Sequence, residues 1–350
     1  MGYLDTLSDM QKEYLSILTN EIPSFLIDYL ETRPMQRIDT VGCSCGTDYV
    51  KIFKKSFYYT NLFHSLAVAL IIWNYTHDKA ETLAGLFHDI ATPAFKHCID
   101  FMNGDYEKQE STEELTSKMI AESEEIMNLL ERDGVKLEEV ADFHSYPIAD
   151  NETPKICADR LEYTFTHGYC SEPVWDLVTI RKMYADIAVL KNEDGIDELG
   201  FKTISSAERF IEGASNLWKT WFDANDRLTM QCFADIIRKL NEHGEISVED
   251  LYKLSEAEII KKIENSKIDG LAETFEKFRN QEQAYESDEE VKGKYCRVVG
   301  AKRRYINPLV IDENGNTKRG KDVSEFIRNK IEDYFAFDTK KYLYFDFDFN

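Results

Sequence analysis

Two imidazoles and two carboxylates interrupt the apolar segments of this chain, and they constrain its fold more than any other feature. His64 lies within NLFHSLAVALIIW, His88 and Asp89 end LAGLFHD, and Asp159 lies in KICADRLEY. Such groups are costly in an apolar interior unless something compensates them. A divalent cation does so, because neutral imidazole and carboxylate suit Mn, Fe, Co, Ni, Zn or Mg. The sequence therefore predicts helices that bring His64, His88, Asp89 and Asp159 to one metal ion.

Helix geometry allows this convergence. Two helices packed roughly 8–10 Å apart can present His64 and His88 to a common point. Adjacent helical residues point about 100° apart, so His88 and Asp89 can share an ion only near a helix end, where the sequence places them. Taken singly, a histidine on an apolar helix is more often a satisfied core residue than a ligand. A second pair, His77-Asp78, lies in the polar NYTHDKAE connection, and we assign it to solvent.

Composition excludes several classes of protein. The 350 residues are 43% hydrophobic and carry a net charge of −23, which indicates a folded chain and disfavours stable binding to nucleic acid or anionic membranes. A small phosphorylated substrate remains possible through local basic groups. The longest apolar run, Leu66 to Trp73, is too short to span a bilayer. No secretory signal is evident, and seven scattered cysteines do not indicate a disulfide framework, so we expect a cytoplasmic protein.

Periodicity predicts a mainly α fold, a helical bundle with a small C-terminal α+β appendage. We expect N-terminal helices and a loop over 1–50, a helical core over 51–240 and an α+β region over 241–350. Within these ranges the pattern predicts one long helix over 112–132, an acidic turn over 192–200, two long helices over 207–240 and a further helix over 248–265. Residues 281–290 are the candidate linker, and strands are expected after residue 285. The basic residues 302–304 either lie on a solvated edge strand, the favoured interpretation, or contact a phosphate.

These motifs resemble those of the HD-domain metal-dependent phosphohydrolases. HSLAVA, AGLFHDI, PAFKHCID, GDYEKQE and ADRLEY are similar to stretches of the deoxynucleotide triphosphohydrolase branch, the dGTPase and SAM-and-HD-domain type. The similarity is clear over roughly residues 55–170 and fainter beyond. It implies that His64, His88, Asp89 and Asp159 bind a metal that activates water against a phosphate, and it suggests a homo-oligomer.

The chain departs from that family at three places. Asn61 stands where the family usually has Arg, Thr92 replaces the middle His of HD-x-x-His-x-x-F-x-H, and Thr112-Glu113 replaces a His-Glu pair. A threonine hydroxyl cannot shuttle a proton near pH 7. We therefore take as catalytic candidates Asp89, His97 and Glu113. For His97 a structural hydrogen bond is an equal alternative.

Four further residues are candidates for substrate binding. Arg160 could contact a phosphate and Tyr163 could stack on a nucleoside, although a core tyrosine is as plausible, and Asn61 and Thr92 take positions that contact substrate in the family. The leading hypothesis is a phosphohydrolase acting on a phosphate ester or anhydride of a nucleotide or related compound. The alternatives are a catalytically impaired nucleotide-binding regulator that keeps the metal site and, against the acidic charge, a nuclease for single strands.

Overall fold

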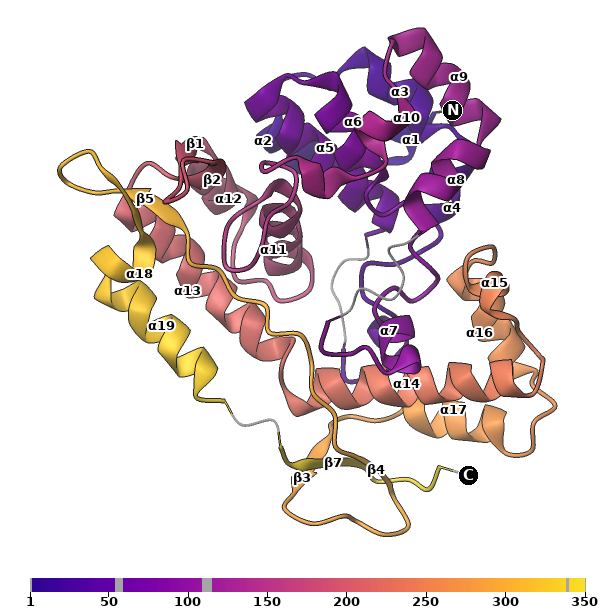
Figure 1. The fold of residues 1–350 in the computed structure, drawn as a ribbon. Helices are drawn as coiled ribbons and strands as arrows, with labels where there is room; N and C mark the ends of the chain where they lie inside the picture. The colour runs from indigo at the N-terminus through magenta and orange to yellow at the C-terminus, as the bar shows by residue number, and fades with distance from the viewer. Residues whose placement is uncertain (1, 54–58, 109–114, 338–339, 350) are drawn as a thin grey trace.

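Helices form most of the molecule in the computed structural model, which describes residues 2–53, 59–108, 115–337 and 340–349 (Figure 1). The helices up to the chain middle are α1 Tyr3–Thr6, α2 Asp9–Leu18, α3 Ser24–Leu30, α4 Arg33–Ile38, α5 Asn61–Thr76, α6 Lys79–Phe87, α7 Cys98–Asn103, α8 Thr116–Glu122, α9 Glu124–Asp133, α10 Leu137–Val140, α11 Ala158–Cys170 and α12 Leu177–Ala185. The later helices are α13 Ile204–Thr220, α14 Ala224–Glu242, α15 Val248–Leu251, α16 Glu256–Glu264, α17 Leu271–Arg279, α18 Gly320–Val323 and α19 Glu325–Phe335. The prediction of a mainly helical fold is confirmed.

Two small sheets accompany the helices. Their strands are β1 Ile187–Lys191, β2 Asp197–Phe201, β3 Tyr285–Ser287, β4 Tyr295–Arg297, β5 Leu309–Ile311, β6 Thr317–Arg319 and β7 Tyr342–Phe345. One sheet has the order β1-β2-β5-β6, in which only β2 and β5 run parallel, with Gly200 opposite Leu309. The other has the antiparallel order β3-β7-β4, with Tyr295 opposite Phe345. The C-terminal region therefore contributes strands to both sheets.

Helix α5 is the centre of the larger apolar cluster. Every residue from Asn61 to Ile72 is buried, and α2, α4, α6 and α11 pack around this segment. Such a helix is hydrophobic on all sides because it is covered on all sides. A second cluster surrounds α14, where Phe233 and Ile237 pack with residues of α7, α16, α17, β4 and β7. The predicted division into residues 1–50, 51–240 and 241–350 stays a prediction.

The prediction of an acidic turn over 192–200 is wrong in part. The turn occupies 192–196, where the side chain of Asn192 accepts from the N–H groups of Asp194 and Ile196 at 3.0 Å each. Residues 197–201 form strand β2, which is buried along most of its length. Its Glu198 is fully buried because Arg319 pairs with both carboxylate oxygens, at 2.6 and 2.8 Å. The acidic residue Glu198 thus belongs to a buried ion pair and not to a solvent-exposed loop.

Three other local predictions need correction. The described part of 112–132 holds two helices, α8 and α9, because Ser123 leaves the helix and its hydroxyl accepts from Ile126 N–H at 3.3 Å. The helix predicted over 248–265 is likewise two, α15 and α16. Residues 302–304 lie between strands rather than on an edge strand, and Arg303 donates to the carbonyls of Tyr334 and Phe337. Among the described residues, no helix combines the length and apolarity that crossing a membrane requires.

Candidate metal centre

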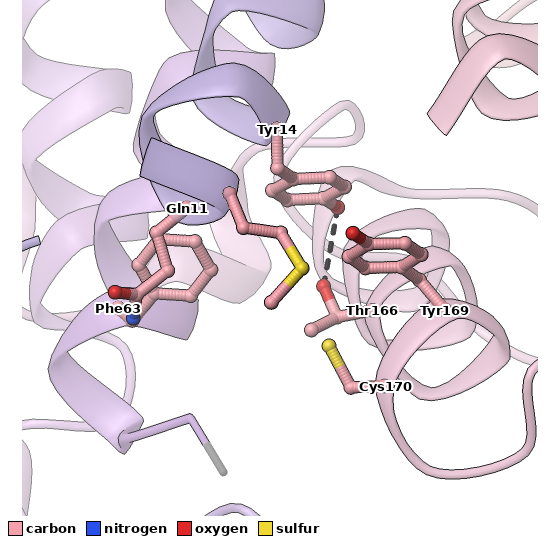
Figure 2. A pocket seen from close by; sticks show the side chains of 7 residues that line it. Gln11, Tyr14, Phe63, Thr166, Tyr169 and Cys170 are labelled. Atoms are coloured by element: carbon pink, nitrogen blue, oxygen red, sulfur yellow. Dashed lines mark hydrogen bonds between the residues drawn. The ribbon is translucent and has the colours of Figure 1, made fainter. Parts of the chain in front are cut away.

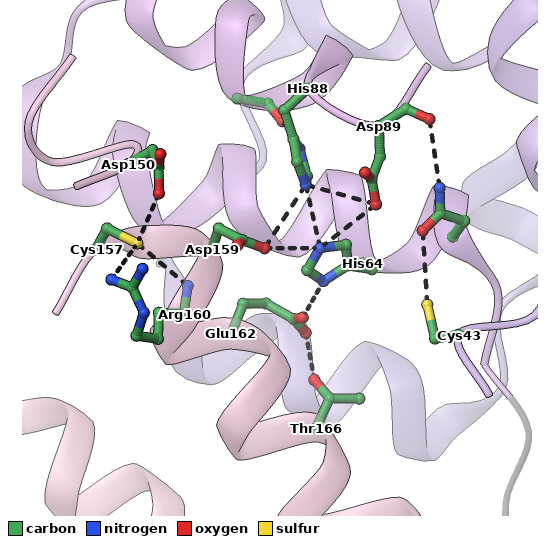
Figure 3. Close-up of polar contacts among 12 residues, drawn as sticks. Cys43, His64, His88, Asp89, Asp150, Cys157, Asp159, Arg160, Glu162 and Thr166 are labelled. Atoms are coloured by element: carbon green, nitrogen blue, oxygen red, sulfur yellow. Dashed lines mark hydrogen bonds and ion pairs between the residues drawn. The ribbon is translucent and has the colours of Figure 1, made fainter. Parts of the chain in front are cut away.

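Three helix ends deliver the four predicted ligands to one place (Figure 3). His64 lies in the first turn of α5, whose N-cap Thr60 accepts from Phe63 N–H. His88 caps the C-terminus of α6 and Asp89 follows it in a turn. Asp159 lies in the first turn of α11, which packs on α5. The side chains therefore meet where all three helices begin or end.

The four candidate ligand atoms converge closely. His64 Nε2 lies 3.1 Å from Asp159 Oδ1 and 3.2 Å from His88 Nε2. His88 Nε2 lies 3.6 Å from Asp89 Oδ2 and 3.7 Å from Asp159 Oδ1. Metal–ligand bonds of about 2.1 Å place neighbouring ligands on one ion about 3.0–3.4 Å apart. The two imidazoles and two carboxylates thus fit a single divalent ion in donor type and, with small shifts, in spacing.

Hydrogen bonds on the far side of each imidazole fix the nitrogen that faces the centre. His64 Nδ1 contacts Glu162 Oε2, and His88 Nδ1 donates to the carbonyl of Gly85 at 2.7 Å. A neutral ring that donates through Nδ1, the form that binds a metal, keeps Nε2 as an acceptor, and such carboxylate or carbonyl partners are typical of metal-binding histidines. Both Nε2 atoms are therefore oriented toward the same point.

Glu162 is itself held rigidly. Its side chain is fully buried one turn after Asp159 on α11. Tyr14 donates to its Oε1 at 3.3 Å, and the hydroxyl of Thr166 contacts the same oxygen. Tyr14 and Thr166, with oxygens 3.1 Å apart, also line a small apolar cavity between α2 and α11 (Figure 2). This second layer of contacts locks Glu162 and, through it, the ring of His64.

The electrostatics of the cluster favour positive charge. Burial alone would lower the pKa of His64, but the charges and hydrogen bonds of Glu162 and Asp159 raise that pKa to about 10. Burial would raise the pKa of Asp89, but the charges of Lys96, His88 and His64 hold it well below its usual value. The pKa of Asp159 is also lowered, because its hydrogen bond to His64 and the charges of both imidazoles outweigh burial. The carboxylates stay ionised and ready to bind a cation.

Asp89 has two further partners that a metal centre does not require. Lys96 Nζ lies 2.8 Å from Asp89 Oδ2 and also contacts Asn61 Oδ1. Asn61 is fully buried, and its Nδ2 donates to the carbonyl of Asp89 at 3.4 Å. Asn61 therefore contacts Asp89 and Lys96 from the protein interior and is not exposed to solvent.

Of the other predicted substrate-binding residues, Arg160 and Tyr163 contact neighbouring elements, and Thr92 contacts the backbone of Asp89. Arg160 donates to Asn151 Oδ1 at 2.9 Å and to the carbonyl of Lys155 at 2.6 Å, so its guanidinium ties α11 to the loop before it. Tyr163 packs edge-on against Trp221, with their ring centroids 5.6 Å apart. Thr92 lies half-buried in the turn after Asp89, whose carbonyl accepts from Thr92 N–H at 3.0 Å.

Of the catalytic candidates beyond Asp89, one can be placed. His97 Nδ1 lies 3.0 Å from Asp100 Oδ2, and Arg304 donates to His97 Nε2 at 3.2 Å. Burial lowers the pKa of His97 despite the hydrogen bond to Asp100, so the ring is neutral at pH 7. Glu113, with its neighbour Thr112, lies outside the described residues.

Sequence reasoning missed Glu162 and Lys96. Glu162 follows Asp159 by three residues, the spacing of one helical face, and this is the signal that could have identified it. Lys96 gave no signal, since a lysine between Phe95 and His97 reads as an ordinary loop residue. The pair His77-Asp78 is exposed, as predicted, and serves as the C-cap of α5 and the N-cap of α6.

Comparisons with known proteins support the fold. No family model matches the chain. A 151-residue segment, 43% of the chain, is 26% identical to the uncharacterized protein YdhJ of Bacillus subtilis strain 168 and spans less than half of that protein, 45% of its length. A hypothetical protein from Aquifex aeolicus superposes with a TM-score of 0.64 at 17% identity over 93% of both chains. A phosphohydrolase from Bacteroides thetaiotaomicron superposes with a TM-score of 0.64 at 14% identity over 93% of this chain and 96% of its own. The chain shares its fold with these two proteins, one of which is named a phosphohydrolase.

Proposed function

We propose that this chain is an HD-type, metal-dependent phosphohydrolase that hydrolyses a phosphate ester or anhydride of a nucleotide or related compound. One observation carries the proposal: His64, His88, Asp89 and Asp159 converge with both imidazoles turned so that Nε2 faces the shared point. The shared fold with a protein named a phosphohydrolase supports it. The placement within the deoxynucleotide triphosphohydrolase branch rests on the motif resemblance alone.

Metal binding and positioning would fall to different residues of the site. His64, His88, Asp89 and Asp159 would hold the ion, and Glu162 keeps His64 in the tautomer that ligation needs. A bound divalent ion supplies Lewis acidity and lowers the pKa of a coordinated water from 15.7 toward about 7, which replaces a nearby histidine base. Asp89 remains the candidate for orienting that water.

The remaining assignments are proposals of the same kind. His97 is neutral and half-buried beside Arg304, which suits a group that accepts or relays a proton once substrate displaces the arginine. Arg160 and Tyr163 would contact the phosphate and nucleoside. Asn61 and Thr92, the other two predicted substrate-binding residues, both donate to the carbonyl of Asp89. The catalytic role of Glu113, the cytoplasmic location and the homo-oligomeric state stay predictions.

A phosphate-release screen tests the function directly. Protein purified without chelator is incubated with nucleoside mono-, di- and triphosphates and Mn, Co, Fe or Mg. We expect turnover that His88→Ala and Asp159→Ala abolish. His243→Ala is the matched control, because His243 is exposed at the end of α14 and should leave turnover unchanged. Full activity in the Asp159→Ala variant would contradict the assignment of the metal site.

The regulator is the second candidate, and Thr92 favours it. In the family pattern this position carries a histidine, and here a half-buried threonine occupies the turn after Asp89. A regulator would bind nucleotide in the presence of metal and release no phosphate after prolonged incubation. Calorimetric nucleotide binding beside the release assay separates the two functions.

A further inference from the structure

Lys96 occupies a backbone conformation that few residues adopt. Phe95 and Lys96 have φ angles of 66° and 44°, in the left-handed region that disfavours residues with side chains. Such strain persists only where surrounding contacts impose it, and it often marks functional sites. Here the buried carboxyl group of Glu256 holds the turn, since its Oε1 accepts from Phe95 N–H at 3.2 Å and from Gly42 N–H at 3.1 Å. The strained turn directs Lys96 toward Asp89.

The ammonium of Lys96 is tied to the ligand set. Its Nζ lies 2.8 Å from Asp89 Oδ2, the same oxygen that faces His88 and His64 at 3.6 and 3.9 Å. Asn61 Oδ1 provides a second contact. The side chain of Lys96 is 12% exposed, so the charge is largely removed from water while still reaching the surface of the site. The arrangement holds one fixed positive charge against the centre.

A charge count shows what this lysine contributes. Asp89, Asp159 and Glu162 bring three negative charges to the cluster, and a divalent ion bound by neutral imidazoles brings two positive charges. The loaded centre would then carry one excess negative charge within a chain of net charge −23. An anionic phosphate approaching such a centre would be repelled. The guanidinium groups of Arg37 and Arg160 also act on Asp89 and Asp159, and Lys96 supplies the positive charge that contacts a candidate ligand directly.

We propose that Lys96 is the charge-balancing residue of this site, which makes the metal-loaded centre receptive to a phosphoryl anion at a cost in metal affinity. The inference rests on the proposed function and adds the residue that determines anion binding. The two effects have opposite signs because an ammonium attracts a phosphate and repels a divalent cation that shares Asp89 Oδ2. A residue that merely shaped the turn would not produce opposite signs.

Calorimetry on the Lys96→Met variant tests this proposal. Methionine is unbranched and only one heavy atom shorter than lysine, so it keeps the apolar stem and removes the charge. Titration with Mn²⁺ alone should show tighter binding than in wild type, by about tenfold or more. Titration of the Mn²⁺-loaded protein with inorganic phosphate should show binding weakened by a similar factor. Lys96→Arg, which keeps the charge, should restore phosphate binding, and Lys253→Met, which removes an exposed lysine of a surface ion pair, should change neither constant.

Each other outcome has a distinct meaning. Weakening of both metal and phosphate binding in Lys96→Met would show that Lys96 only shapes Asp89, and unchanged constants would show that its charge is irrelevant; either result overturns the proposal. If Lys96→Met fails to fold, the same titrations with Mn²⁺ and with inorganic phosphate are performed on the Lys96→Gln variant. Wild-type protein that binds no Mn²⁺ would overturn the proposed function itself, which is a separate failure.

Discussion

At the scale of single residues, the candidate metal site depends on groups outside its four predicted ligands. Glu162 is fully buried, and it fixes the tautomer of His64 through one oxygen while Tyr14 and Thr166 hold the other. The four candidate ligands could be predicted from the sequence because imidazoles and carboxylates stand out among apolar neighbours. Glu162 was missed although it follows Asp159 at helical spacing, because an acidic residue on a helix is usually solvent-exposed and its partner Tyr14 is 148 residues away.

The Glu162→Gln variant should weaken metal binding by about tenfold to a hundredfold. Glutamine keeps the shape of the side chain but loses the charge that stabilises the His64 ring while it donates through Nδ1. Competition with a chromophoric chelator measures the metal dissociation constant. Glu212→Gln, a substitution at an exposed glutamate of α13, is the control. Equal affinity in Glu162→Gln and wild type would show that Glu162 has no part in orienting the ligand.

At the scale of secondary structure, the two His-Asp pairs show why a dipeptide alone does not define a site. His88-Asp89 ends α6 toward the interior, whereas His77-Asp78 joins α5 to α6 at the surface. Their difference follows from flanking apolarity and was predictable. The hairpin β1–β2 and the break at Ser123 were not, because a buried pair between Glu198 and Arg319 and a single helix cap leave no trace in periodicity.

The Asp78→Ala variant should lose about 1 kcal/mol of stability and keep its metal. Asp78 Oδ1 accepts from Glu81 N–H at 2.8 Å at the N-cap of α6, and alanine cannot replace that acceptor. Urea denaturation measures the free energy of unfolding, and metal analysis of the same sample measures the site. Loss of bound metal with unchanged stability would show that the His77-Asp78 pair, and not only the His88-Asp89 pair, takes part in metal binding.

At the scale of the whole molecule, Glu256 ties distant segments together. This residue opens α16, and its buried carboxyl accepts from the backbone of the Gly42 loop and of the strained turn at Phe95. Burial and the charge of Asp48 raise its pKa from 4.5 to about 8, against those two hydrogen bonds. Such long-range junctions are invisible in a single sequence, since nothing local marks the partners. They explain why most helices could be predicted from the sequence, whereas the contacts between these distant segments could not.

The raised pKa of Glu256 predicts a stability that falls with pH. An acid whose pKa is higher in the folded state stabilises the fold fully below its unfolded pKa of about 4.5, and that contribution is lost as pH rises through about 8. Glu256→Gln keeps an acceptor oxygen and does not titrate. We therefore expect the wild type to lose about 2–4 kcal/mol relative to Glu256→Gln between pH 5 and pH 8.5. Urea unfolding at both values measures the difference, and parallel pH profiles would contradict it.

The metal content of the protein tests the central claim most directly. Wild type, Asp159→Ala and Asp78→Ala are purified without chelator, equilibrated with Mn²⁺, Fe²⁺, Co²⁺ or Zn²⁺, dialysed and analysed by mass spectrometry for metal per chain. The convergence of His64, His88, Asp89 and Asp159 predicts about one equivalent in wild type and Asp78→Ala and almost none in Asp159→Ala. Wild-type protein without metal, or Asp159→Ala with a full equivalent, would contradict this account of the site.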